Sequence, residues 1–536
     1  MIKINDPRQH NIFDPWGFLT PKRRQLLDCG WPGLFREHIL PILPVHRISA
    51  YFNVDFGRPS KELFSMLGAL VLQQAFDLTD EECTQQFAFN IQWHYALNIT
   101  EESDLAKYIS AKTLWNFRNI VASNNLVDVI FKDVTMQLAH VFNVDFQKQR
   151  IDSVHIKSNM RRLGRIGIFS ESIHKFLVNL KRNHPGLFNT VEQTIVENYL
   201  NTNSEGCFSK VKPSESRKTL DQVSRDLFDL VQQFKTHEKV ADMHSYKLLE
   251  RVLKEHCNLT EDSNNPIEIK KPKEIPSDSL QNPSDPDASY CGHKGQGYQV
   301  QIMETFCDDP ENQPDSPNLI THVDVEPAHN SDANALIPAI ESAESAGLKP
   351  DVVLADSLYG SDENCQQAQR IDVDVVAPTM GTVDKAKLNL ADFEFSSQDR
   401  VTACPQGHAP VKTKKKKNIS AAFDKEHCQC CPFFPICPIT QGAHHNYLHY
   451  SAKEARIAMR RKHEQSEEFA ERYRWRAGAE ATMSEYDRRT GAKRLRVRGL
   501  KAVKFCTTLK ALAINMFRSA AARLRAKSAN PGFCGA

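Results

Sequence analysis

The amino-acid sequence predicts an α/β protein, in which a mixed sheet flanked by helices follows a helical N-terminal domain. Apolar residues recur at helical spacing through most of residues 1–145. From residue 146 onward, short segments rich in β-branched residues alternate with helical ones, which is the pattern of an α/β layer fold. Hydrophobic residues make up 40% of the 536-residue chain and charged residues 25%, so the chain can bury more than one apolar core.

The N-terminal 145 residues contain clear helix signals. Residues 63–76 present a wide apolar helix face. Asp80 is expected near the start of a second helix because two further acids follow it, and Ser110 is expected to cap a third. We therefore expect residues 1–145 to form a helical domain.

Residues 146–400 carry the strand signals. Residues 150–157 alternate β-branched and polar side chains, as a half-buried strand does. Ser331 and Asp332 are expected to start a helix between two pairs of later strands. Those later strands are predicted at residues 297–303, 319–325, 351–355 and 373–377.

Two segments separate the first predicted strand from the second. Residues 163–257 return to helical patterns and are interpreted as a helical insertion with no assigned role. Residues 258–287 are rich in Pro, Ser and Asn, so we expect a linker or an ordered loop there without regular elements.

The charge of the chain is unevenly distributed. Residues 411–536 hold 27 Lys and Arg against 10 Asp and Glu, a net charge of +17, so the overall +2 leaves −15 for the remainder. After Asp487 no acid follows, whereas 13 basic residues do. Such asymmetry favours a polyanion as partner, although a solvated basic tail is the alternative. The expected phosphate contacts are Arg488, Lys493, Arg494, Arg496 and Arg498.

Three acids stand where catalytic groups are expected. Asp152 lies within the first predicted strand, and Asp356 follows the short strand 351–355 directly. Reacting groups gather beyond strand ends in open α/β sheets. Glu480 lies in a helical segment, in which Tyr473, Arg476 and Glu480 are spaced by three and four residues and therefore share one face.

Such a set of acids suits phosphodiester chemistry. Cleavage needs an activated oxygen nucleophile and a stabilised leaving oxygen, and a pair of Mg²⁺ ions can supply both. Mg²⁺ prefers a few carboxylate oxygens and keeps waters or phosphates as its other ligands. Arg476 is expected to hold a phosphate or to orient Glu480. Alternatively, Asp356 is a turn residue and Glu480 belongs to a surface ion pair.

Several segments together resemble the insertion-sequence DDE transposases. Residues 151–159 and 354–362 resemble the family's first and second catalytic blocks, and Tyr473, Arg476 and Glu480 match its Y-R-E signature. Residues 491–499 are similar to the basic segment that follows. Residues 57–97 look like the InsH-type N-terminal domain, and residues 292–300 resemble the second strand.

The resemblance implies a ribonuclease-H-like core with Mg²⁺ or Mn²⁺ held by Asp152, Asp356 and Glu480. It also implies double-stranded DNA as partner, namely terminal inverted repeats and target DNA, and a homodimer or higher oligomer. Residues 1–145 would then serve DNA binding or oligomerisation, and residues 446–536 would hold the catalytic helix and the basic segment. One departure is Asp487, where the family has a basic residue; Arg488 stands beside it.

A cysteine cluster lies between residues 401 and 445, a segment interpreted as a small insertion. Cys404, Cys428, Cys431 and Cys437 can close a tetrahedral structural zinc site. Cys430 and His408 are alternative ligands, and a set of reduced thiols is the alternative to zinc.

The sequence predicts a transposase that cleaves and joins DNA strands in the bacterial cytoplasm, associated with the nucleoid. No signal peptide is visible, and the apolar stretch 63–76 is too short to span a bilayer. Two alternatives remain: an inactive, domesticated relative that only binds DNA, and a ribonuclease-H-like nuclease that cleaves without joining.

Overall fold

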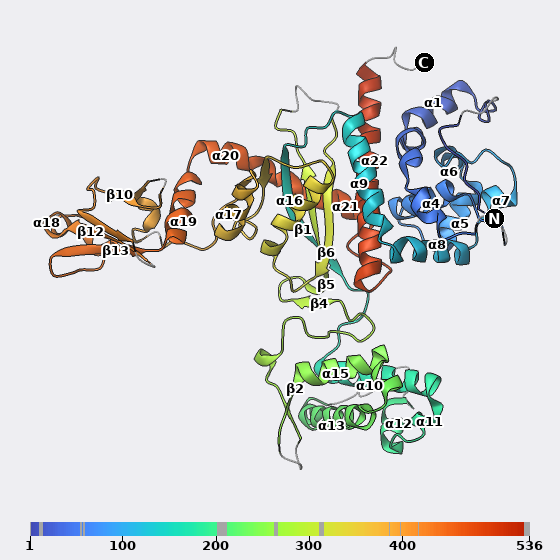
Figure 1. Ribbon diagram of the computed structural model, residues 1–536, viewed down its shortest axis with the longest axis horizontal. Coiled ribbons are helices and arrows are strands. Elements are labelled where there is room, and N and C mark those ends of the chain that lie inside the picture. The colour runs from blue at the N-terminus through green and yellow to red at the C-terminus, as the bar shows by residue number, and fades with distance from the viewer. Residues whose placement is uncertain are drawn as a thin grey trace.

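The computed structural model describes residues 2–9, 14–53, 56, 59–200, 212–261, 266–309, 316–384, 386–396, 398–415 and 418–529. A central sheet is flanked by helices, with the N-terminal helices on one side, a separate helical unit below, and an arm ending in a small β-rich unit (Figure 1). Gly57 and Arg58, part of the segment resembling the InsH type, lie outside the described residues.

The central sheet has the order β6-β5-β1-β7-β8. Strand β1 is antiparallel to β5, which is antiparallel to β6, whereas β1, β7 and β8 run parallel. This mixed topology confirms the predicted ribonuclease-H-like α/β fold, and the short β4 pairs with the start of β5. The strands are β1 (Lys148–Lys157), β4 (Ser289–Cys291), β5 (Gly295–Thr305), β6 (Ile320–Pro327), β7 (Val352–Leu354) and β8 (Asp374–Val376).

Alternating side chains of β1 supply two cores. Ile151 packs with α16 (Leu336–Ser345) and α17 (Asp362–Arg370) on one face of the sheet. Val154 and Ile156 point to the other face, which is covered by α9 (Leu126–Val141), α21 (Gly478–Thr490) and α22 (Leu500–Ala529). Alternation along a strand has this consequence because successive side chains point to opposite faces.

The N-terminal helices share their core with the C-terminal helix α22. Helix α22 packs against α4 and α9 and also against β6. Buried Asn515 on α22 donates to Thr135 Oγ1 of α9 at 3.1 Å and to the Ile320 carbonyl of β6 at 2.8 Å. No helix of the described chain, including α22, is long and apolar enough to cross a bilayer.

The predicted helix starts in the N-terminal region are largely as expected. Ser110 caps α8, and α5 begins at Asp80 with Thr79 as its cap in a capping box. The elements are α1 (Pro21–Cys29), α2 (Trp31–Leu34), η1 (Phe35–Ile39), η2 (Leu40–Ile42), α3 (Val45–Ser49), α4 (Leu63–Ala75), α5 (Asp80–Phe89), α6 (Ile91–Ala96), α7 (Asp104–Lys107) and α8 (Ala111–Ser123).

The helical insertion folds around a core of its own. Phe176, Leu230 and Leu249 are fully buried in it, and none belongs to the cores of the sheet. Its helices are α10 (Arg165–Asn183), α11 (Pro185–Phe188), α12 (Gln193–Leu200), η3 (Pro213–Glu215), α13 (Ser216–Phe234), α14 (Glu238–Ala241) and α15 (His244–His256).

Residues 258–287 contain more regular structure than expected. A short hairpin forms between β2 (Cys257–Leu259) and β3 (Ile267–Ile269), and η4 (Pro272–Glu274) follows. Three residues of alternation at β3 are too few to predict a strand. Leu280 and Asp285 are fully buried, so this segment is packed against the insertion and the sheet.

The cysteine-rich region belongs to a small β-rich unit. Phe423, Leu448 and Tyr450 lie in its core. Helix α19 (Ala452–His463) and α20 (Glu467–Tyr473) lead from it back to the sheet (Figure 1). The unit comprises η6 (Leu390–Asp392), β9 (Glu394–Phe395), β10 (Val401–Ala403), β11 (Lys412–Lys415), β12 (Ile419–Asp424), α18 (Lys425–Gln429), η7 (Phe434–Ile436) and β13 (His445–Tyr450).

Candidate active site

The fold places the three predicted acids at one end of the parallel strands. Asp152 lies in the middle of β1, and Asp356 lies in the turn that follows β7. The Asp356 carboxylate accepts a hydrogen bond from the Leu358 backbone at 2.8 Å, which fixes the turn. Glu480 lies in the first turn of α21, the helix that packs on β1.

Arg476 links two of the acids. Its Nη2 lies 2.9 Å from Asp152 Oδ2, and its Nη1 lies 3.1 Å from Glu480 Oε1. The Asp152 side chain is only 15% exposed, whereas that of Glu480 is 72% exposed. One guanidinium therefore spans the space between a recessed carboxylate on the sheet and an open one on the helix.

The surroundings of Asp152 are negative as well as buried. Burial raises the pKa of Asp152, Arg476 opposes that rise, and the neighbouring Asp356 and Asp332 carboxylates add to it. The Ser153 backbone donates to Asp152 Oδ1 at 2.8 Å. Neighbouring carboxylates that raise the pKa of Asp152 make a negative site that favours a bound cation.

Tyr473 completes this group. Burial is the main cause of the raised pKa of Tyr473. The Asp356 and Asp152 carboxylates raise this pKa further, whereas Arg476 lowers it. We expected one helix through residues 473–480. The structure has α20, the 3-10 segment η8 (Arg474–Ala477) and then α21, and this path still brings Tyr473, Arg476 and Glu480 to the acids.

Gly478 allows α21 to approach the sheet closely. A Cβ at Gly478 would lie 2.0 Å from Arg150 Nη1, which real structures do not tolerate. The same guanidinium group donates to the Trp475 carbonyl at 2.8 Å. The side chain of Arg150 therefore fills the place that another residue at position 478 would occupy.

Glu304, a residue that the sequence reasoning missed, anchors the Glu480 helix. Its side chain is 2% exposed and pairs with Arg150 Nε and Arg518 Nη1, each at 2.7 Å. Thr482 of α21 donates to the same carboxylate at 2.7 Å. Arg518 also pairs with Glu485 at 2.9 Å. An acid directly after the predicted strand 297–303 was the available signal.

The acids present suitable donors for a divalent ion. Carboxylates from three different elements are the ligands that Mg²⁺ prefers. Within the described ranges, no group of three or more His, Cys, Asp or Glu side chains is arranged, as it stands, to hold a metal ion. At the acids, the guanidinium of Arg476 occupies the position between Asp152 and Glu480.

The four predicted zinc ligands line one cavity of about 40 Å³, and Cys430 does not line it. Cys404 begins a tight turn in which the Gly407 backbone donates to its carbonyl at 2.8 Å, with Gly407 at φ +82°. Burial raises the pKa of the Cys437 thiol to about 11, and the other three thiols add to the rise. These four cysteines therefore face one cavity, but among the described residues no three of them are arranged, as they stand, to hold a metal ion.

The predicted phosphate contacts have different surroundings. Arg488 and Arg494 are exposed, and no carboxylate in the described part of the chain forms an ion pair with them. Arg496 pairs with Asp77 at 3.1 Å, and Arg498 lies 3.2 Å from Met160 Sδ.

Asp487, the departure from the family pattern, has a local structural role. The Lys493 backbone donates to its carboxylate at 3.0 Å, and the Lys493 ammonium lies 3.8 Å away. Asp487 therefore fixes the turn that leads into the basic segment.

The basic residues of α22 are largely committed to contacts within the protein. Lys510 is 1% exposed and pairs with Asp77 at 2.8 Å. Lys504 pairs with Asp128 at 3.1 Å, and Arg523 pairs with Glu37 at 2.8 Å. The excess of positive charge at the C-terminal end therefore divides into an exposed segment before α22 and a neutralised set along that helix.

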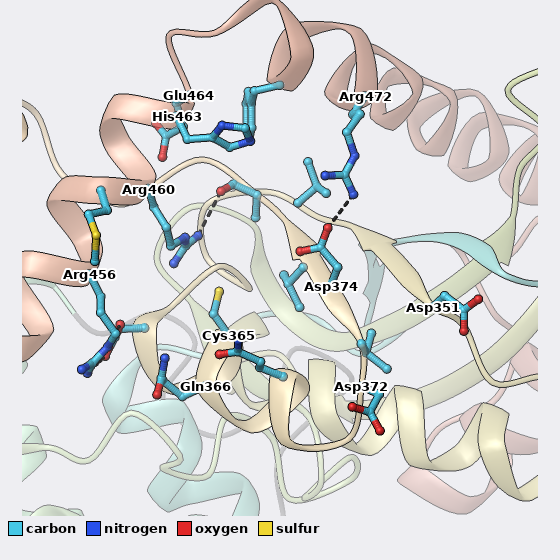
Figure 2. A pocket seen from close by; sticks show the side chains of 18 residues that line it. Asp351, Cys365, Gln366, Asp372, Asp374, Arg456, Arg460, His463, Glu464 and Arg472 are labelled. Atoms are coloured by element: carbon cyan, nitrogen blue, oxygen red, sulfur yellow. Dashed lines mark hydrogen bonds and ion pairs between the residues drawn. The ribbon is translucent and has the colours of Figure 1, made fainter. Parts of the chain in front are cut away.

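A cavity of about 630 Å³ lies beside β8, between α17, α19 and α20 (Figure 2). Its arginines are engaged with the protein: Arg456 pairs with Asp362 at 2.7 Å, and Arg472 pairs with Asp374. None of the three predicted catalytic acids lines this cavity. It is therefore distinct from the acid site.

Two family models match the chain. Residues 403–520 match a family described as "Transposase DDE domain", and residues 32–119 match one described as "Transposase domain (DUF772)". The first match contains Glu480, and the second spans the helices from α2 to most of α8. The second match supports a transposase domain in residues 32–119, while its InsH type stays a prediction. No curated protein matches the chain.

Proposed function

We propose that this chain, which carries the transposase domains of the insertion-sequence DDE type, cleaves DNA at the ends of an insertion element and joins them to target DNA. One observation carries the proposal: Arg476 bridges Asp152 and Glu480 at the sheet, and the Asp356 carboxylate is near enough to raise the pKa of Asp152. Cleavage would free a 3′-hydroxyl at the element's end, and that hydroxyl would then attack a target phosphodiester.

Asp152, Asp356 and Glu480 would hold Mg²⁺ or Mn²⁺, on which DDE transposases generally depend. When bound, these ions activate an oxygen nucleophile and stabilise the leaving oxygen. Arg476 holds Asp152 and Glu480 on the same side of the site before an ion competes for their oxygens. Tyr473 is half-buried, and Asp356 and Asp152 contribute to raising its pKa.

The DNA partners would be the terminal inverted repeats and the target, with a homodimer or higher oligomer pairing two ends in the bacterial cytoplasm. Arg488, Lys493, Arg494 and Arg498 are proposed to contact phosphates. Arg496 was predicted to join them, but its ion pair with Asp77 makes it a weaker candidate.

Two assays separate this proposal from its alternatives. Purified protein should nick a supercoiled plasmid in Mg²⁺, and it should join a pre-cut element end to a second DNA molecule. Binding without nicking would indicate the inactive relative. Nicking without joining would indicate a nuclease. Either outcome, obtained with end DNA taken from sequence flanking the gene, contradicts the proposal.

We also propose a structural zinc ion held by Cys404, Cys428, Cys431 and Cys437. Their shared cavity and the turn at Gly407 support this ligand set, since bound zinc takes thiolates from short loops. We expect about one zinc per chain by elemental analysis of protein purified without chelator. A zinc-free, folded protein would contradict the proposal.

A further inference from the structure

We propose that DNA is held through its backbone phosphates by a cationic surface where the sheet joins the helical insertion. We call it the junction surface and define it by five residues: Lys157, Arg162, Lys294, Arg494 and Arg498. The inference rests on the proposed function and deepens it by naming where the duplex lies. These residues come from the end of β1, the segment leading into α10, the β4–β5 turn and residues 491–499.

Backbone and side-chain contacts bring these four segments together. The Lys157 backbone donates to the Lys493 carbonyl at 3.1 Å, which joins β1 to the basic segment. The Arg162 guanidinium carbon lies 4.8 Å from the centre of the Tyr290 ring on β4. Arg498 touches the segment after β1 through Met160. The five cations therefore belong to one region of the molecule.

A buried carboxylate fixes the basic segment in this region. Asp285 is fully buried and accepts hydrogen bonds from the Gly499 backbone at 2.9 Å and from the Ser158 hydroxyl at 2.5 Å. Tyr298 of β5 donates to Asp285 Oδ1, the same oxygen that accepts from Gly499. The carboxylate of Asp287 accepts from the Leu500 backbone at 2.9 Å. Both acids are used to hold backbone rather than to neutralise exposed arginines.

The five side chains are exposed and available. None of them forms an ion pair with a carboxylate among the described residues, whereas their neighbours Arg161 and Lys493 lie beside Glu171 and Asp487. Lys504, Lys510 and Arg518 of α22 are also paired with acids. Unpaired like charges repel one another, and a polyanion that spans them removes that repulsion.

The junction surface begins on the strand that carries Asp152, one residue further along and on the opposite face of β1. Lys294 Nζ lies 3.3 Å from the hydroxyl of Ser153, the residue after Asp152. Burial lowers the pKa of His155, and the nearby Lys294 and Lys157 ammonium groups lower it further. Strand β7 pairs with β1 only as far as Arg150, so the rest of β1 extends beyond it. A duplex cut at Asp152 can therefore continue over this surface.

The test compares two triple variants with the intact protein. The junction variant carries Lys157→Gln, Arg162→Gln and Lys294→Gln. The control carries Arg217→Gln, Lys218→Gln and Lys239→Gln, three exposed cations on α13 and α14 of the helical insertion. Binding to a labelled duplex of arbitrary sequence is measured over a series of salt concentrations, since phosphate contacts need no particular sequence.

Each lost phosphate contact lowers the log–log salt slope by roughly 0.9, so the junction variant should lose roughly 2.7. The control should keep the wild-type slope. The single variant Lys294→Gln should lower the magnitude of this slope by about 0.9. It provides an independent measurement if the triple variant is not stably folded. A wild-type slope in both junction variants, or an equal loss in the control, overturns the inference while the proposed function stands. Failure of the intact protein to bind DNA overturns both.

Discussion

Replacing Glu304 by alanine should destabilise the protein and displace the helix that carries Glu480. The carboxylate joins Arg150 of β1, Thr482 of α21 and Arg518 of α22. Arg150 is 8% exposed and would keep the Trp475 carbonyl and the face of the Phe306 ring as partners, neither of which carries a negative charge. Removing one member of a buried ion pair costs about 3–5 kcal/mol, because the remaining charge is left in a poorly solvated place.

The free energy of unfolding is measured in urea, with tryptophan fluorescence as the signal. Trp475 lies next to the network and stacks on Phe306 at 6.5 Å, so it reports locally. The matched control is Glu344→Ala, which removes a half-exposed partner of Lys349 and should cost at most about 1 kcal/mol. Pairing Glu304→Ala with Arg150→Met should restore part of the loss, because no unpaired guanidinium is then left at Arg150.

Plasmid nicking in Mg²⁺ supplies the functional readout. At a temperature where the Glu304→Ala protein is folded, nicking should still be slower, since α21 has lost its contact with β5. The reasoning is refuted if Glu304→Ala loses no more stability than the Glu344→Ala control. It is also refuted if Arg150→Met worsens the stability of the Glu304→Ala protein.

Three further predictions follow from the acid site. Asp152→Ala, Asp356→Ala and Glu480→Ala should each abolish nicking in Mg²⁺ yet retain DNA binding, and near wild-type nicking by any one removes that residue from the triad. In a solvent-exposed helix, Gly→Ala raises stability by about 1 kcal/mol. At position 478 the new methyl group would clash with Arg150, and such overpacking costs roughly 1–3 kcal/mol, so Gly478→Ala should lower the melting temperature. A higher melting temperature would argue against that contact. Burial raises the pKa of Asp152, so the nicking rate should fall on acidification at a higher pH than an ordinary aspartate would give. More Mg²⁺ should move this loss of activity to lower pH, because the cation binds the ionised carboxylate. A pH profile of nicking that does not depend on Mg²⁺ would contradict this.

Local pattern predicted much of the sheet and the positions of the acids. The alternation at residues 150–157 corresponds to β1, and the short apolar segment before Asp356 corresponds to β7. These predictions succeeded because a residue's own neighbours decide which face of a strand or helix it occupies. Ser110 as a helix cap is equally local.

The network around Glu304 could not be predicted in that way. Arg150 lies 154 positions before Glu304, and Arg518 lies 214 positions after it. Periodicity shows that a side chain is buried, but it does not show which distant charge it meets. The pair between Asp77 and Arg496 escaped the sequence for the same reason, although both residues are charged and visible.

The position of α22 has a consequence for how the protein is made. Helix α4 ends at Ala75, and its packing partner α22 begins at Leu500. At about 5–20 residues per second, the ribosome needs roughly 20 to 90 seconds to bridge that interval. During this time the N-terminal helices keep an apolar face without its partner, which calls for chaperone protection. A nascent or prematurely terminated chain also lacks the Arg518 contact that holds the Glu480 helix on the sheet. The capacity to cut DNA would therefore arise only after α22 has been made and has packed against the sheet.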